Sequence, residues 1–514
     1  MGFFKEWYYM KKKLTLWSVH FFIVFFVYHI FINEIFQVDN IIGISKGNTL
    51  YSTDFSLASL LSGRGVNYII GVILGFLKYD WYKLFKFSQI FKMMTMALLS
   101  TIVAIEIQRR INLDDKYKII GINLAALIAV VNPFCVQIYT FVTIDWGIDF
   151  LMVALAIYFL GEKRYIWAFV FSFLTINSYQ AFITLIAVIG ICFILLDCDF
   201  EIKKECFKEV IKLAIITIIP AILTIGIMHI KVGSAGISAA DVKQMSIDAN
   251  NGTGILQNTV DKILAIYNKY VISAFVNGYS MIGFKAVLLF FCISLLIIVG
   301  ILIYQKKFFA VLMALIGIFF MVVAPFSIGL IQAGMYLPTR IVFPFFLSLA
   351  CMAFIVIKIW DYKYSFIYSL LVLGFLIILS NSAFNVGLDC YTIYNNDIAI
   401  GDEISDMIRI YEEESNNTVD TIKVLDWSER VDKMSIVYYD QMHYNYDPEV
   451  IMSKTLWSDA GIAPLFKFVS GRDYTIEYMD IDEYSVMFKN NGQGNIILSE
   501  QVKFEGNIMY LDIR

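Results

Sequence analysis

The feature that most constrains this chain is a series of long apolar runs between residues 14 and 384, separated by short gaps in which lysine and arginine gather. An α-helix needs ~20 apolar residues in a row to cross the hydrocarbon core of a bilayer. Hydrophobic residues make up 59% of the chain, and its mean hydropathy is +0.70. The sequence therefore predicts an α-helical polytopic membrane protein.

The basic gaps predict which side of the membrane each loop faces. Clusters such as Arg109-Arg110 and Lys163-Arg164 all fall on one side if the amino terminus is inside, as the positive-inside rule requires. We expect about eleven spans in a plasma membrane. An odd number of crossings places the carboxyl terminus outside. The expected spans are 14–32, 84–107, 117–133, 139–160, 164–178, 179–197, 210–230, 283–304, 308–331, 340–358 and 364–382.

Charge divides the chain into two predicted domains. Residues 1–383 form the transmembrane domain, with long outside loops at 33–83 and 231–282. From Phe384 onward there are 24 acidic and 10 basic residues, so 384–514 are expected to form a small, soluble, extracytoplasmic α+β domain. A helix is expected at 397–413, followed by strands at 421–425, 434–439, 476–478, 484–488, 495–499 and 509–513.

Two short helices are expected in the outside loops. Residues 66–77 are apolar but too few to cross, and aromatic and basic residues follow them, which favours an interfacial or re-entrant helix. Residues 254–274 repeat apolar side chains every three or four positions, which indicates an amphipathic helix. A plain covering loop remains the alternative for the second segment.

Cysteine and histidine positions predict neither a disulfide framework nor a metal site. Cys198 and Cys206 fall in a loop assigned to the cytoplasm, and the four histidines lack metal-ligand spacing. No Gly-rich phosphate loop, dinucleotide fingerprint or nucleophile elbow occurs in the sequence. We expect no bound cofactor and no nucleic-acid partner, while dependence on a divalent cation stays open.

Carboxylates in the first outside loop are candidate catalytic residues. Asp39 and Asp54 precede Arg64, which lies at the start of the short apolar helix. A carboxylate just above the membrane can act as a general base, and a nearby arginine can bind phosphate. The alternative for each carboxylate alone is a solvated loop residue.

Further candidates lie at the outside ends of later spans. Asp145 falls in the outer half of the fourth span, where an ionisable group is costly unless it faces a polar cavity or a partner. Tyr179 and Gln180 interrupt an apolar run, where they can meet a ligand hydroxyl or satisfy freed backbone groups. Arg340 can pair with Arg64 around a phosphate. Helix termination by Asp145 and headgroup anchoring by Arg340 are the structural alternatives.

Four elements occur in a characteristic order across the membrane region. They are an acidic first outside loop, Gly63-Arg64 before a short apolar helix, the run from Ser178 to Phe182, and Pro338-Thr339-Arg340 before the penultimate span. This order resembles the bacterial Gtr type II glucosyltransferase family of polytopic GT-C glycosyltransferases. Family members typically carry adjacent acidic residues before Gly-Arg, whereas here Asp54 has no acidic neighbour.

The resemblance implies transfer of a hexose, glucose in this family, from a polyprenyl-phosphate donor lipid to a cell-surface glycan such as O-antigen, outside the cell. Asp54 or Asp39 would take the proton of the acceptor hydroxyl, and Arg64 and Arg340 would stabilise the lipid phosphate. Asp145, Tyr179 and Gln180 would bind substrate. A polysaccharide polymerase or ligase, or a lipid-linked sugar flippase or transporter, is the alternative, although no internal repeat typical of transporters occurs in the sequence.

Overall fold

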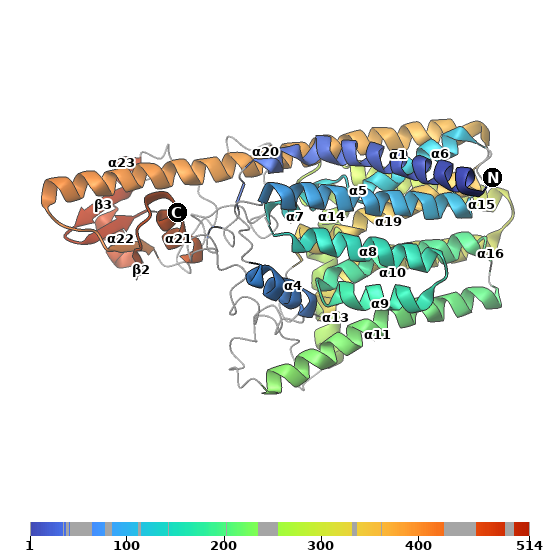
Figure 1. Cartoon of the computed structure of the whole chain (residues 1–514), viewed down its shortest axis with the longest axis horizontal. Coiled ribbons are helices and arrows are strands. Elements are labelled where there is room, and N and C mark those ends of the chain that lie inside the picture. Colours follow the sequence, from blue (N-terminus) through green and yellow to red (C-terminus); the bar gives the residue numbers. More distant parts are fainter. Residues whose placement is uncertain are drawn as a thin grey trace.

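The protein consists of a large helical bundle with a smaller unit, containing a β-sheet, at one end (Figure 1). Large apolar side chains are exposed on the outside of the bundle, for example Phe26 at 76% and Leu296 at 71%, and such a surface suits lipid. This computed structural model describes residues 2–33, 35–36, 41, 64–77, 85–111, 115–141, 143–201, 203–234, 255–331, 337–360, 362–425, 459–488 and 498–512.

The main helices of the bundle follow the apolar runs of the sequence. They are α1 (Gly2–Tyr28), α4 (Gly65–Phe76), α5 (Phe85–Arg110), α6 (Lys116–Ile128), α7 (Val136–Thr140), α8 (Asp145–Gly161), α9 (Tyr165–Ile176), α10 (Ile183–Asp197), α11 (Lys204–Ser234), α13 (Ile255–Ile266), α14 (Ile272–Asn277), α15 (Ala286–Tyr304), α16 (Phe308–Val323), α17 (Ile328–Ile331), α18 (Thr339–Val342), α19 (Pro344–Ile359) and α20 (Tyr362–Ser415). Short turns extend several of them, namely η1 (His29–Ile32), η3 (Pro133–Cys135), η4 (Gln180–Phe182), η5 (Tyr267–Val271) and η6 (Ala324–Phe326).

Eight helical segments in the described part of the chain are long and apolar enough to cross a membrane. Each overlaps one of the expected spans, and the three remaining expected spans overlap α8, α9 and α11. The chain is therefore a multi-pass helical membrane protein. The eight segments are Lys12–Ile32, Phe85–Arg110, Lys116–Thr140, Gln180–Asp197, Ala286–Tyr304, Phe308–Phe326, Thr339–Ile359 and Tyr364–Ser415.

The expected boundary between spans 117–133 and 139–160 is wrong. The chain continues past Pro133 through η3 and α7, and it turns only between Thr140 and Asp145. Asn132 accepts a hydrogen bond from the backbone N–H of Cys135 (3.3 Å), and Pro133 occupies the first position of η3. Because proline fits the first turn of a helix, Asn-Pro here restarts a helical segment. Asp145 consequently begins α8.

The expected hairpin between α9 and α10 is confirmed. Asn177 ends α9, and its Nδ2 donates to Phe173 O and to Thr224 Oγ1 of α11, each at 2.9 Å. The short apolar helix expected in the first outside loop is also present, as α4. Its Ile73 and Phe76 side chains are exposed.

The C-terminal unit begins within α20, the last membrane helix, which continues into it. The 54-residue α20 runs without a break past residue 384, so no linker separates the bundle from the expected tail. The unit also contains β1 (Thr421–Leu425), α21 (Asp459–Ser470), β2 (Thr475–Met479), α22 (Ile481–Met487), α23 (Leu498–Gln501), β3 (Val502–Glu505) and β4 (Ile508–Leu511).

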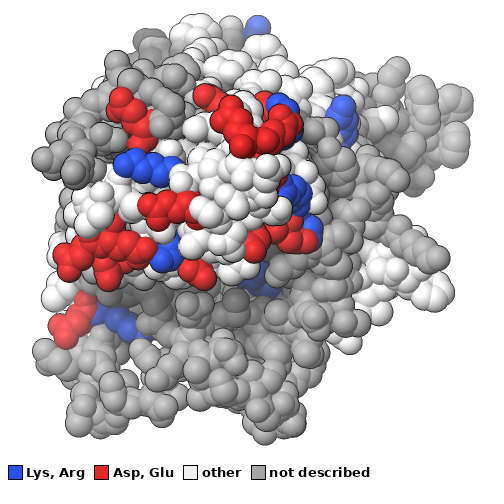
Figure 2. All heavy atoms as spheres, turned by 90° about the vertical axis from the view of Figure 1, so that its left-hand side faces the viewer, with Lys and Arg blue, Asp and Glu red and all other residues white. Residues whose placement is uncertain are grey.

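The sheet of this unit has the order β2-β1-β4-β3, with β1 parallel to both neighbours and β3 antiparallel to β4. A separate apolar core packs the sheet against the end of α20 and against α21 through Ile404, Ile408, Ile422, Phe466 and Met509. More acidic than basic side chains cover the face of this unit that points away from the bundle (Figure 2).

Two expected strands of the tail are wrong. Residues 498 and 499 of the expected strand at 495–499 belong to helix α23, and residues 495–497 lie outside the described residues. Residues 484–488 were predicted as a strand, but most of them belong to helix α22. The Asp480 side chain accepts a hydrogen bond from the Glu483 backbone N–H (2.8 Å), and Asp482 and Glu483 occupy the first turn. A side-chain cap and acidic residues near the amino end both stabilise a helix. The expected strand at 434–439 lies outside the described residues, and strand β3 was missed.

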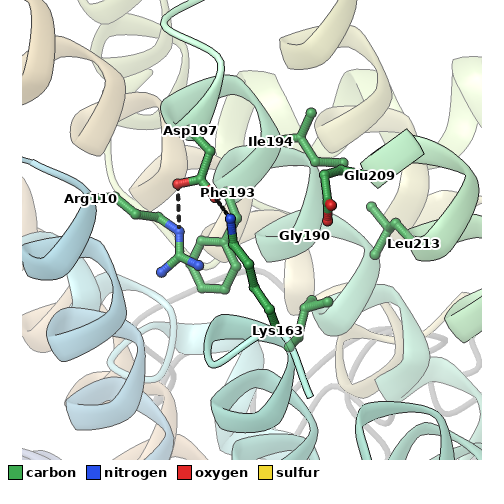
Figure 3. A pocket seen from close by; sticks show the side chains of 9 residues that line it. Arg110, Lys163, Gly190, Phe193, Ile194, Asp197, Glu209 and Leu213 are labelled. Carbon is green, nitrogen blue, oxygen red and sulfur yellow. Dashed lines mark ion pairs between the residues drawn. The ribbon is translucent and has the colours of Figure 1, made fainter. Parts of the chain in front are cut away.

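Charged residues of the basic gaps meet at the end of the bundle opposite the C-terminal unit. Asp197 of α10 pairs with Arg110 Nε (3.2 Å) and Lys163 Nζ (3.6 Å), and the Arg110 guanidinium stacks 3.9 Å from the centre of the Phe193 ring (Figure 3). The Arg110 Nη1 atom also lies 3.1 Å from Glu106. Because these cations already have carboxylate partners, this pocket is a structural ion-pair network joining α5, α8 and α10.

The expectation that no disulfide forms is wrong for one pair of cysteines. A disulfide joins Cys198 and Cys206, whose Cα atoms are 6.1 Å apart. The tight turn between α10 and α11 brings the two residues within bonding range. The sequence pattern predicts the compartment of these two cysteines, but it does not record that they lie close together in the fold.

Candidate functional site

Several predicted site residues meet at the end of the bundle that bears the C-terminal unit (Figure 1). The first turn of α4 is attached to the end of α9 by a backbone hydrogen bond from Val66 N to Asn177 O (3.0 Å). Arg64 precedes α4, while Tyr179 and Gln180 follow α9. The structure therefore brings together residues that lie more than a hundred positions apart in the sequence. Asp39 and Asp54 lie outside the described residues.

Two buried carboxylates occupy the first turns of α8. Asp145 and Asp149 are four residues apart, so they share one face of the helix. Asp149 Oδ1 accepts a hydrogen bond from Ser178 Oγ, which also lies 2.6 Å from Asn67 Oδ1 of α4. Asp145 is 7% exposed, and its Oδ1 has no hydrogen-bond partner among the described residues. Asp149 thus joins α4, α8 and the α9 turn, whereas Asp145 retains an acceptor atom for a ligand.

A row of three aromatic rings separates the two predicted phosphate-binding arginines. The Arg64 guanidinium lies 4.9 Å from the centre of the Tyr179 ring, which lies 4.6 Å from that of Trp146. The Trp146 ring lies 5.4 Å from that of Phe141, and the Arg340 guanidinium lies 5.2 Å from Phe141. Cation–π contacts of this kind orient a guanidinium group and fix its position. Each arginine therefore packs on a ring at one end of a series of three contacting rings.

Gln137 of α7 fixes the segment that carries Arg340. Its Oε1 accepts hydrogen bonds from Thr339 Oγ1 (3.0 Å) and from the Arg340 backbone N–H (3.1 Å). The Nε2 atom of this buried side chain has no partner in the part of the chain that the structure describes. Gln137 therefore positions Arg340 and leaves a donor for a ligand.

Two polar residues of α5 that sequence reasoning missed hold the turn between α7 and α8. Lys92 Nζ donates to the backbone oxygens of Phe141 and Ile138, the latter at 3.4 Å, and Gln89 Nε2 donates to Tyr139 O (2.8 Å). The last carbonyl groups of a helix lack partners within the helix, and they need others when they are buried. The signal was present in the sequence, because an ionisable residue within an apolar run is uncommon and usually functional.

The cluster combines groups that suit a ligand with anionic and hydroxyl oxygens. Arg64 Nε is buried and, within the described ranges, makes no hydrogen bond. A guanidinium group matches the geometry of phosphate, and a carboxylate such as that of Asp145 accepts hydrogen bonds from hydroxyl groups. Buried polar groups normally have partners, so these atoms make the cluster a candidate ligand site.

The fold defines a multi-pass membrane protein, and this cluster of polar and aromatic groups at one end of its helical bundle is the candidate functional site. Residues 28–357 match the family model described as Glucosyl transferase GtrII, and the chain belongs to this glucosyltransferase family. The predicted resemblance is thereby confirmed. The matched range includes every residue of the site from Arg64 to Arg340. No curated protein and no solved structure has significant similarity to the chain.

Proposed function

We propose that this glucosyltransferase moves glucose from a polyprenyl-phosphate-linked donor to a cell-surface polysaccharide, of the O-antigen kind, on the extracytoplasmic side of the plasma membrane. The observation that carries the proposal is the placement of Arg64 and Arg340 at the two ends of an aromatic row beside the buried Asp145. A donor molecule that joins a phosphate to a sugar would use an arginine for its phosphate, and the aromatic rings and Asp145 for its sugar. The GT-C type of mechanism, in which the donor is a lipid phosphate, fits this arrangement.

Arg64, which directly precedes α4, would bind the donor phosphate, and helix α4 would meet the lipid. The exposed Ile69, Ile73 and Phe76 give α4 an apolar face, which favours the membrane interface. The polyprenyl chain can then stay in the bilayer while its phosphate reaches Arg64. Asp145, Tyr179 and Gln180 would contact the sugar, with its C–H face against the aromatic rings.

The transfer itself needs a base for the acceptor hydroxyl. The acceptor oxygen forms a bond to the anomeric carbon as the bond from that carbon to the phosphate oxygen breaks, and the bonding electrons leave with the phosphate. The hydroxyl proton passes to a carboxylate, for which we propose Asp54 or Asp39 of the first outside loop. Arg64 would stabilise the charge that develops on the phosphate.

Orientation follows from the charges at the opposite end of the bundle. Arg110, Lys163 and Lys358 all lie there in ion pairs with Asp197 or Asp199. If the positive-inside rule assigns this end to the cytoplasm, the site and the C-terminal unit face outward. The C-terminal unit contacts the first outside loop, since the Phe36 ring lies 6.4 Å from that of Phe468 of α21. We infer that the unit helps to hold the acceptor near the site.

Composition and linkage analysis of surface glycans tests the proposal in cells. We expect one glucose branch in cells with the chain and none in cells without it or with Arg64→Ala. Arg409→Ala is the matched control, because Arg409 is an exposed arginine on α20 that pairs with Asp406 and Glu413, away from the site. Unchanged branching with altered glycan length would contradict the proposal in favour of a polymerase or ligase. Accumulation of the lipid-linked sugar inside the membrane would favour a flippase.

A further inference from the structure

Lys92 is a charged side chain that the bundle buries completely, with 0% exposure. Its ammonium group has three N–H donors, and three acceptors surround it: Gln89 Oε1 at 3.2 Å, Ile138 O at 3.4 Å and Phe141 O. All three donors are therefore used within the protein. Lys92 has no proton left for a direct hydrogen bond to substrate, so any role in transfer acts through another residue.

A purely structural role would be that of a helix cap. The carbonyl groups at the end of α7 are buried, and both Lys92 and Gln89 donate to them. An uncharged donor is sufficient for such a cap, as Gln89 demonstrates on Tyr139 O (2.8 Å). The positive charge of Lys92 is costly to bury unless a negative charge balances it. Capping alone does not explain why this position carries a lysine.

Asp145 is the carboxylate that interacts electrostatically with Lys92, and it also interacts with Arg64. The turn that Lys92 holds, between α7 and α8, ends at Asp145. Lys92 thus acts on Asp145 through its charge and through the backbone of the turn.

We propose that Lys92 is a positioning residue for glucosyl transfer, which holds the turn that ends at Asp145, so that Asp145 Oδ1 stays available to the substrate hydroxyls. The inference rests on the proposed function, in which Asp145 holds the transferred sugar. Lys92 lies on α5 and would act without contacting the substrate itself.

A double-mutant cycle on the purified full-length chain tests the pair. Lys92→Gln keeps N–H donors for the carbonyl groups but removes the charge, and Lys92→Arg keeps the charge. Transfer is measured from a glucosyl-phosphoryl-polyprenol donor, giving kcat and KM for Lys92→Gln, Asp145→Asn and the double variant. Lys92→Arg is the matched control. Gln89→Met is a comparison variant, which removes a cap of the same turn and one acceptor of Lys92 Nζ (3.2 Å) without changing the charge.

We expect Lys92→Gln to lower kcat/KM on the order of tenfold to a hundredfold, the size of effect that misplaced substrate-contacting groups produce. The loss should be much smaller when Asp145 is already asparagine, because the two residues act as a unit. Lys92→Arg should retain most activity, and Gln89→Met should lower the yield of folded protein more than kcat/KM.

Equal losses in both backgrounds would overturn the inference, as would a loss in Lys92→Arg as large as in Lys92→Gln. If Lys92→Gln does not fold, Lys92→Arg still tests the pair, because Asp145→Asn must then cost as much with arginine as with lysine. Unchanged transfer by Asp145→Asn alone would instead remove the sugar-holding role of Asp145. Absence of any transfer by the unaltered chain would overturn the proposed function.

Discussion

Ser178→Ala is the substitution whose effect on stability follows most directly from the site. Ser178 is fully buried, and it donates a hydrogen bond to the buried Asp149 and contacts Asn67 of α4. Removing one partner of a buried hydrogen bond leaves the acceptor unsatisfied, which costs ~1–3 kcal/mol. We therefore expect Ser178→Ala to lower the free energy of unfolding by about 2 kcal/mol. It should also raise KM for the donor, because α4 follows directly on Arg64.

Ser172→Ala is a matched control for this prediction. Ser172 lies on the preceding helix α9 and is equally buried, but its Oγ has no hydrogen-bond partner among the residues that the structure describes. Removal of an unpaired buried hydroxyl is neutral or slightly stabilising. Thermal unfolding of both variants in the same lipid nanodiscs gives the comparison. Equal stability of Ser178→Ala and Ser172→Ala would refute the reasoning that Ser178 joins α4, α8 and α9.

Two further predictions concern packing and pH. Gly147→Ala should destabilise the contact of α8 with α5 by about 1–3 kcal/mol, because a Cβ atom there would overlap the Phe91 ring. Gly283→Ala should leave the thermal midpoint unchanged, since no described atom lies within 4 Å of the added group. Hydrogen bonds from Thr421 and Asn507, both 2.8 Å, lower the pKa of Asp420. This stabilisation is present above about pH 3.9 and is lost as the pH falls through the lower folded pKa. Asp420→Asn should therefore lower the unfolding midpoint slightly at pH 7 but not at about pH 2, and the reverse pattern would contradict the assignment.

The sequence predicts the helical membrane class because apolar runs must be buried in lipid, whatever the neighbouring helices do. It also places the α9–α10 turn correctly, since Asn177 to Gln180 is polar within an apolar stretch. It misplaces the turn before Asp145, because Asn132-Pro133 can either end a span or restart a helix. Local hydrogen bonds decide that choice, and the sequence pattern does not record them.

The site is only partly predictable for a similar reason. Arg64, Asp145, Tyr179 and Arg340 are visible as polar residues near span ends, and the structure connects them through rings and charges. Pairing of Asp149 with Ser178, or of Gln137 with Thr339, depends on helices that lie far apart in the chain. Lys92 was predictable as a buried charge, but its partners at the end of α7 were not.

The most direct test of the account is transfer by the purified chain in proteoliposomes. Radiolabelled glucosyl-phosphoryl-polyprenol and radiolabelled nucleotide-glucose are offered separately with a lipid-linked glycan acceptor. We predict that label moves to the acceptor from the polyprenyl donor, and that Arg64→Ala prevents this while Arg409→Ala does not. Transfer from the nucleotide sugar alone, or transfer that Arg64→Ala leaves unchanged, would contradict the proposed donor site.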